Sequence, residues 1–261
     1  MHTKTKVKCR YVYGPVFSWR LNRSLGIDPI SQKRKICSFN CRYCQVKGKS
    51  IFTVKRKVFV PLSAIIKELK TLPQFKADFI TFSGRGEPTL AKNLGAIIRA
   101  VKGLRKEPVA VLTNSTLLHR KRVREELKAA DRVIAKLDAA STQKLVKINQ
   151  PAKSISFSKI LKGLMDFRKM YRGILGLQVM FVSENKAEVK KLVKLCAQIR
   201  PDLIYLNTPL RPNRCRPLSK KEMMKIKKEF SKTKTVCVYD KIKGMKIRVL
   251  TSRAALKARG R

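Results

Sequence analysis

Residues 79–114 read FITFSGRGEPTLAKNLGAIIRAVKGLRKEPVAVLTN, and this stretch decides the fold class. Two short apolar runs, Phe79–Gly84 and Val109–Asn114, flank an amphipathic stretch at Leu94–Leu104. Short apolar runs bounded by turn residues predict buried strands, and apolar residues at a period near 3.6 predict a helix. A strand–helix–strand unit of this length is typical of an α/β protein with a parallel sheet.

The same alternation continues along the chain on both sides of this unit. Further strands are predicted at Arg132–Asp138, Leu175–Val182 and Leu203–Thr208. Further helices are predicted at Pro61–Leu72, Lys121–Ala130, Ser156–Tyr171 and Ala187–Ile199. Periodicity does not decide between an open sheet and a barrel. In both, a ligand binds at the carboxyl ends of the strands.

Three cysteines lie close together in ICSFNCRYCQ, residues 36–45, as Cys37, Cys41 and Cys44. Their C-x3-C-x2-C spacing lets three thiolates converge on one metal centre. A closed zinc site needs a fourth ligand, for which Cys9, His2 and His119 are candidates. An iron–sulfur cluster held by three cysteines leaves one iron open for another ligand.

This loop resembles the signature of the radical S-adenosylmethionine (SAM) superfamily, which has an aromatic residue, here Tyr43, before the third cysteine. The resemblance implies that Cys37, Cys41 and Cys44 bind a [4Fe–4S] cluster whose fourth iron chelates SAM. It also implies one-electron cleavage of SAM to methionine and a 5′-deoxyadenosyl radical, which abstracts hydrogen from a substrate. An electron donor of the flavodoxin or ferredoxin type is then required.

The polar residues at the strand ends match the superfamily's SAM-binding positions. The resemblance assigns Glu87 to the methionine amino group and Asp138 to a ribose hydroxyl. Taken alone, such residues are more often turns or helix N-caps. The predicted SAM-binding residues are Tyr43, Gly84, Gly86, Glu87, Thr113, Asn114, Asp138 and Asn207.

A narrower resemblance covers residues 13–218. The opening YGPVFSWRLNRSLGID, together with LDAA, INQP and LNTPLRP in that order, is similar to the wyosine-synthase-like branch of the superfamily. It implies a partial (β/α)6 barrel of the TIM type, and the named enzymes of that branch modify a guanosine in tRNA. Phe17, Trp19 and Asn22 depart from the usual proline, arginine and glycine, and Arg85 from the usual asparagine. Because the opening would line the substrate side, the resemblance implies cluster and SAM binding but does not by itself imply the same substrate.

The sequence divides at residue 218. We expect residues 1–218 to form the radical SAM core and residues 219–261 to form a C-terminal cap or basic extension. The tail contains a helix pattern at Lys220–Phe230, two short strand patterns, TVCVYD and IRVL, and the basic end ARGR. It would cap the sheet or serve as an RNA-contacting arm.

Charge is the most unusual property of the composition. The chain of 261 residues has 62 Lys and Arg against 16 Asp and Glu, a net charge of +46. Heat adaptation usually raises Lys and Glu together, so it fits poorly. A polyanionic partner such as RNA, tRNA included, fits better. A radical SAM enzyme acting on a protein or a small metabolite, and a non-catalytic zinc-stabilised RNA-binding protein, are the alternatives.

The composition also indicates the cellular compartment in which we expect the protein. No apolar run approaches the roughly 20 residues that a membrane span needs, and MHTKTKVKCR lacks the apolar core of a secretory signal. We therefore expect a cytoplasmic protein of undetermined oligomeric state, without a disulfide framework.

Several residues outside the motifs have side chains that suit a functional role. Cys196 and Cys237 lie in apolar patterns and are predicted core residues, whereas Cys9 is ambiguous. Arginine neighbours would lower the pKa of Cys215, for which an auxiliary ligand or redox thiol is the alternative to an exposed loop cysteine. A base-stacking platform of Phe17 and Trp19 beside Arg20 and Arg23 is an alternative to core packing.

Overall fold

The computed structural model describes residues 9–46, 48–211, 213–240, 247 and 249–259. Eight strands form one sheet in the order β1-β2-β5-β6-β7-β8-β9-β10. Their bounds are β1 Val12–Ser18, β2 Asn22–Ile27, β5 Phe79–Phe82, β6 Val109–Thr113, β7 Arg132–Lys136, β8 Ile174–Met180, β9 Leu203–Asn207 and β10 Thr235–Cys237.

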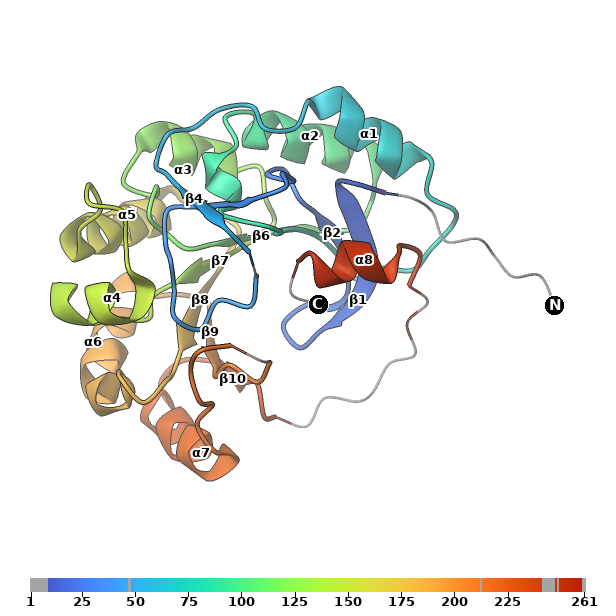
Figure 1. Ribbon diagram of the computed structural model, residues 1–261. Coiled ribbons are helices and arrows are strands. Elements are labelled where there is room, and N and C mark those ends of the chain that lie inside the picture. Colours follow the sequence, from blue (N-terminus) through green and yellow to red (C-terminus); the bar gives the residue numbers. More distant parts are fainter. Residues whose placement is uncertain (1–8, 47, 212, 241–246, 248, 260–261) are drawn as a thin grey trace.

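The sheet has the direction and curvature that the sequence predicts. Only β1 and β2 pair antiparallel; every pair from β2 to β10 is parallel. The sheet curls into a half-barrel, with helices on its outer face (Figure 1). The predicted α/β class and partial TIM-type barrel are therefore confirmed.

At least one helix follows each parallel strand from β5 to β9, as expected for β-α-β crossovers. The predicted helices are present with ends shifted by a few residues, and α4 and α8 are additional. Their bounds are α1 Leu62–Lys70, α2 Leu94–Leu104, α3 Lys121–Leu127, α4 Thr142–Asn149, α5 Phe157–Met170, α6 Val189–Ile199, α7 Lys220–Glu229 and α8 Arg253–Lys257; short 3-10 turns cover Pro88–Leu90 and Lys186–Glu188.

The core lies between the outer face of the sheet and these helices. In α2 the buried residues Leu94, Ile97, Ile98 and Val101 recur at helical spacing, so one stripe of the helix packs on the sheet. β8 is buried along almost its whole length. Its one polar side chain, Gln178, is only 8% exposed and faces the inside of the barrel.

The hairpin of β1 and β2 was not predicted as a unit. Its turn lies at the amino ends of the parallel strands, because β2 begins directly after the turn and runs parallel to β5. Asn22 has a φ of 53°, a left-handed conformation that asparagine tolerates better than most residues. Leu21 packs on Ala110, Ile134 and Tyr205, so the turn closes the amino end of the barrel interior.

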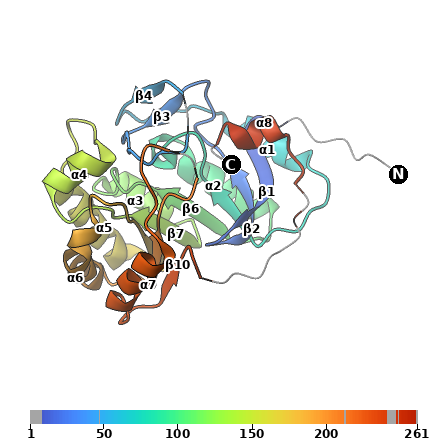
Figure 2. The same cartoon turned by 60° about the horizontal axis from the view of Figure 1, so that its bottom comes forward.

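The cysteine loop is held by a second, two-stranded sheet of β3, Lys35–Cys37, and β4, Ser50–Phe52. Figure 2 shows this pair apart from the main sheet, at one end of the molecule. β3 also bridges to the segment after β5: the Ile36 carbonyl accepts from the Glu87 N–H at 3.1 Å. This contact fixes the first cysteine against the end of β5.

The tail both extends and covers the sheet. β10 adds a parallel strand beside β9, and α8 contacts β1 (Figure 1). The IRVL pattern, residues 247–250, falls partly outside the described residues; Leu250 donates its N–H to the Gly14 carbonyl of β1 at 2.9 Å. Division of the chain at residue 218 stays a prediction.

Candidate active site

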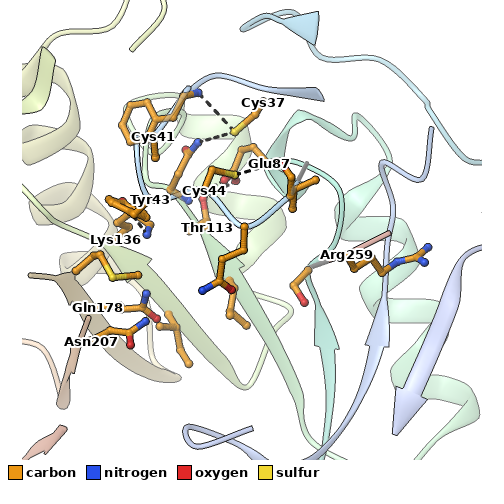
Figure 3. Close-up of a pocket in the computed structure, with 18 of the residues that line it drawn as sticks. Cys37, Cys41, Tyr43, Cys44, Glu87, Thr113, Lys136, Gln178, Asn207 and Arg259 are labelled. Atoms are coloured by element: carbon orange, nitrogen blue, oxygen red, sulfur yellow. Dashed lines mark hydrogen bonds between the residues drawn. The ribbon is translucent and has the colours of Figure 1, made fainter. Parts of the chain in front are cut away.

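A cavity of about 410 Å³ lies inside the half-barrel, at the carboxyl ends of the strands. Cys37, Cys41 and Cys44 line one end of it, and the ends of β5 to β9 form its walls (Figure 3). Of the predicted site residues, those that line this cavity are Cys37, Cys41, Tyr43, Cys44, Gly84, Gly86, Glu87, Thr113, Asn114 and Asn207. Asp138 does not line the cavity.

N–H groups point at the cysteine sulfurs. The Phe39 N–H donates to Cys37 Sγ at 3.5 Å, and Asn114 Nδ2 donates to the same sulfur at 3.6 Å. Asn149 Nδ2 donates to Cys41 Sγ at 3.4 Å. Burial raises the pKa of Cys37 to about 12, with Lys35 as the main opposing influence. Donors of this kind stabilise sulfur as a thiolate metal ligand.

Lys35 places a buried positive charge beside the three thiols. The residue is 4% exposed and lines the cavity. Burial lowers the pKa of Lys35, but the charges of Cys44, Cys37 and Cys41 outweigh burial and raise the pKa above its usual value. A buried ammonium group needs an anionic partner, which the three sulfurs would supply as thiolates when they bind a metal.

Glu87 is held by four hydrogen bonds at the end of β5. Its Oε1 accepts from the Thr89 N–H at 3.1 Å, the Thr89 hydroxyl at 2.7 Å and the Thr113 hydroxyl at 2.6 Å. Its Oε2 accepts from the Asn114 N–H at 2.7 Å. Burial raises the pKa of Glu87, while the hydrogen bonds lower it. Glu87 lines the cavity, and its Oε2, with one protein donor, has capacity for another.

The two glycines of this segment are required by packing. A Cβ on Gly84 would overlap the Asp28 carboxylate, and a Cβ on Gly86 would overlap the Ile36 carbonyl oxygen. Both glycines line the cavity, and their contact with SAM stays a prediction. What the structure shows is that they let the cysteine loop and Asp28 reach the end of β5.

Tyr43 and Asp138 form one buried network. The Tyr43 hydroxyl donates to Asp138 Oδ2 and accepts from Lys136 Nζ at 3.1 Å and Asn149 Nδ2 at 2.9 Å. Asp138 Oδ1 accepts from the Met180 N–H at 2.8 Å. Burial, and next the Asp138 carboxylate, raise the pKa of Tyr43 well above its usual value. Asp138 therefore holds the Tyr43 ring in position through a hydrogen bond to its hydroxyl. A contact between Asp138 and a ribose stays a prediction.

Asn114 connects the cysteine loop to the strand end. Its Nδ2 donates to the Ser38 hydroxyl at 3.0 Å, and its Oδ1 accepts from Thr116. Neither Asn114 nor Asp138 caps a helix: α3 begins at Lys121, and Ser141 is the N-cap of α4. The alternative explanation of these residues as caps is wrong.

Sequence reasoning missed several polar residues of the cavity. Lys35, Lys136 and Gln178 line it, together with Arg20 from the hairpin turn. Gln178 could have been found from the sequence, because it is a lone amide in an apolar strand. The three basic residues could not, because nothing distinguishes them from the other Lys and Arg residues among the 62 in the chain.

The other candidates have mixed outcomes. Cys196 and Cys237 are buried core residues, as predicted. The pKa of Cys215 is raised by burial and next by Glu184, so the expected activation by its arginine neighbours is wrong. The residues of the stacking alternative are placed as follows: Trp19 lines the cavity, Phe17 is 40% exposed, and Arg23 pairs with Asp78 at 2.7 Å, so stacking on a base stays untested. His119 binds the Thr116 carbonyl at 2.9 Å, and His2 lies outside the described residues.

Comparison with known proteins identifies the class. Residues 34–196 match the family model described as the radical SAM superfamily. The chain is 43% identical over 202 residues to the UPF0026 protein slr1464 of Synechocystis, covering 77% of this chain and 76% of that protein. It is 37% identical over 255 residues to a protein of Brachyspira hyodysenteriae named GTPase Obg, covering 93% of this chain but only 37% of that much longer protein.

Solved structures show the same fold. A structure of TYW1 with a lysine-pyruvate adduct bound has a TM-score of 0.63 at 16% identity, over 89% of this chain and 81% of that one. Streptococcus suis SuiB bound to S-adenosylmethionine has a TM-score of 0.60 at 12% identity, over 81% of this chain and 52% of that one.

This chain belongs to the radical SAM superfamily and, within it, to the family of the UPF0026 proteins. It is a radical SAM enzyme, whose cofactors are a [4Fe–4S] cluster and SAM. The alternative of a non-catalytic zinc-stabilised protein is wrong. Among the helices in the described part of the chain, none has the length and apolarity of a membrane span.

The residues of the cavity fit these cofactors. Two of the three thiols, Cys37 and Cys41, accept from N–H donors, and a buried cation lies beside all three, which suits a cluster with a net negative charge. In the described part of the chain, no three Cys, His, Asp or Glu side chains, the three cysteines included, are grouped around one metal position, so the fit rests on the chemistry of the donors around the cysteines. Cys9 and His119, the candidate fourth zinc ligands, are not among the residues that line the cavity.

Proposed function

We propose that Cys37, Cys41 and Cys44 hold the cluster and that the ends of β5, β6 and β9 hold SAM beside it. The observation that carries this proposal is the single cavity lined both by the three cysteines and by Glu87. When bound, the cluster and SAM would supply radical chemistry that removes a hydrogen atom from the substrate. The protein's own part is to position both groups and to exclude water.

Each residue at the SAM end has a role that its contacts support. Glu87 accepts from the methionine amino group through Oε2, while Thr113 and the Asn114 N–H keep the carboxylate in place. Tyr43 contacts SAM from the cysteine loop, braced by Asp138. Asn207, at the end of β9, faces the adenosine. Gly84 and Gly86 allow the cysteine loop to close over this end.

We further propose that the substrate is an RNA, with tRNA the first to test. Its support is the net charge of +46 and the resemblance of the sequence to the wyosine-synthase-like branch. An acidic flavodoxin or ferredoxin would dock on the same basic surface as electron donor. A protein or a small metabolite is the competing substrate class.

The cluster assignment is tested by three single Cys→Ser variants at Cys37, Cys41 and Cys44, purified and reconstituted without oxygen. Each is expected to lose most of its iron and sulfide and the visible absorption of the cluster. Cys9→Ser is the matched control, since Cys9 is half-buried and does not line the cavity. Retention of a full cluster by two or more of the three variants would refute the assignment.

The substrate class is tested by binding titrations with tRNA, a single-stranded RNA and duplex DNA over a range of salt. An RNA substrate predicts preference for one RNA class that persists as salt rises from about 50 to 200 mM, on top of a steep loss of overall affinity. Equal binding of all three polyanions at every salt concentration would favour a protein or metabolite substrate instead.

A further inference from the structure

The inner end of the cavity is closed by the β1–β2 turn. Trp19 and Arg20 come from this turn, at the amino ends of the strands, and both line the cavity. The Arg20 guanidinium lies 5.1 Å from the centre of the Trp19 ring, and that ring meets Tyr205 edge-on at 5.8 Å. The floor of the cavity, opposite the cysteines, is thus an arginine fixed against an aromatic side chain.

Arg20 is the first of a row of polar side chains that runs along one wall of the cavity. Its Nη1 donates to Gln178 Oε1 at 2.6 Å. Lys136 is the register partner of Gln178 on the neighbouring strand β7. Figure 3 shows Lys136, Gln178 and Asn207 along one side of the cavity. Because Arg20 occupies the oxygen of the Gln178 amide, the other end of that amide is a donor.

The charges in the cavity are strongly unequal. Its lining has one carboxylate, Glu87, and five cationic side chains: Arg20, Lys35, Lys136, Arg211 and Arg259. Glu87 already accepts four hydrogen bonds, Lys35 lies beside the thiols, Arg259 pairs with Asp28 at 3.1 Å, and Lys136 pairs with Asp138 at 3.7 Å. SAM itself carries a sulfonium charge. Because cations outnumber carboxylates in the lining, the potential in the cavity is positive and favours an anion at the floor.

We propose that the floor is a substrate subsite that binds an oxyanion, with Arg20, Gln178 and Lys136 as its donors. Arginine offers a planar pair of N–H donors, which suits phosphate and carboxylate oxygens. This inference rests on the proposed function, because it places the substrate between the floor and the cysteine end. In an RNA substrate, the anion is a phosphate of the nucleotide that enters the barrel.

Trp19 is the only tryptophan of the chain, so its emission reports on the floor alone. The reconstituted protein with SAM is titrated with inorganic phosphate and, separately, with acetate, at constant ionic strength. We expect a saturable change in Trp19 emission with the preferred anion. In Arg20→Gln the affinity should fall at least about tenfold, since a hydrogen bond to a charged group is lost.

Arg99→Gln is the matched control, because it removes one exposed cation from α2, away from the cavity. It should bind the anion as the wild type does. Lys136→Met is the second variant, in case Arg20→Gln does not fold, and it should also bind more weakly. Tighter binding of phosphate would identify a phosphate subsite, and tighter binding of acetate a carboxylate subsite.

The inference is overturned if neither anion changes the emission of the wild type in a saturable way. It is equally overturned if the folded variants bind as tightly as Arg99→Gln does. Formation of 5′-deoxyadenosine by the wild type is measured in parallel. Its absence would refute the proposed function, whereas its presence without anion binding would refute only the subsite.

Discussion

Replacing Glu87 by glutamine removes one charge and changes almost nothing in shape. Three donors meet Oε1 and one meets Oε2, so the glutamine oxygen will turn toward the three. Its NH2 group then faces the buried Asn114 N–H, which loses its acceptor at a cost of about 1–3 kcal/mol of stability. The methionine amino group of SAM loses a charge-assisted hydrogen bond of about 1.5–3 kcal/mol, a 10- to 150-fold weaker affinity.

Two assays measure these effects separately. Urea unfolding of the variant without cofactors gives the stability term, and equilibrium dialysis of labelled SAM against the reconstituted variant gives the affinity term. Glu125→Gln is the control, since Glu125 is exposed on α3, and should match the wild type in both. A SAM affinity within threefold of wild type in Glu87→Gln would contradict the role that we give to this carboxylate.

Three further substitutions test the surroundings of the site. Gly86→Ala forces a Cβ into the Ile36 carbonyl, so urea unfolding should show a free energy of unfolding lower by about 1–3 kcal/mol, and the variant should retain less iron. Gly103→Ala is the control: its Cβ meets open space, so it should not destabilise the protein. Lys35→Met removes the cation beside the thiols, so a redox titration should find the cluster potential lowered by on the order of 100 mV, with exposed Lys33→Met unchanged. Arg259→Met leaves Asp28 buried without its partner and should cost about 3–5 kcal/mol at neutral pH. Burial raises the pKa of Asp28 and Arg259 lowers it, so the variant raises it further; protonation then favours the folded state, and the deficit should shrink as the pH falls. A deficit that does not depend on pH would contradict the buried ion pair.

Much of the fold was predictable because the parallel strands are continuous apolar runs. β6 and β8 are buried on both faces, and α2 shows an unbroken helical stripe. The β1–β2 hairpin was missed as a unit, because Asn22–Ile27 begins with polar residues and its turn is buried only by the rest of the barrel. In α4 only Leu145, Val146 and Ile148 are aliphatic, too few to give a clear period.

The site residues that could be predicted belong to residue types that are rare in this chain or stand in a distinctive motif. Cysteines 37, 41 and 44, and the glutamate after a glycine-rich turn, stand out in any sequence. Lys35, Lys136 and Arg20 do not stand out among 62 basic residues, and only the tertiary structure brings them to one cavity. The position of Asp138 behind Tyr43 likewise depends on packing between the cysteine loop and β7.

The central claim is that the cysteine end and the Glu87 end of one cavity act together on SAM. Its most direct test is to incubate the reconstituted protein with dithionite and SAM under anaerobic conditions and to measure 5′-deoxyadenosine. We expect about four irons per chain and steady formation of 5′-deoxyadenosine, with both lost in a Cys37→Ala, Cys41→Ala, Cys44→Ala triple variant. A full four-iron cluster that never cleaves SAM, or cleavage that survives the triple substitution, would contradict the account.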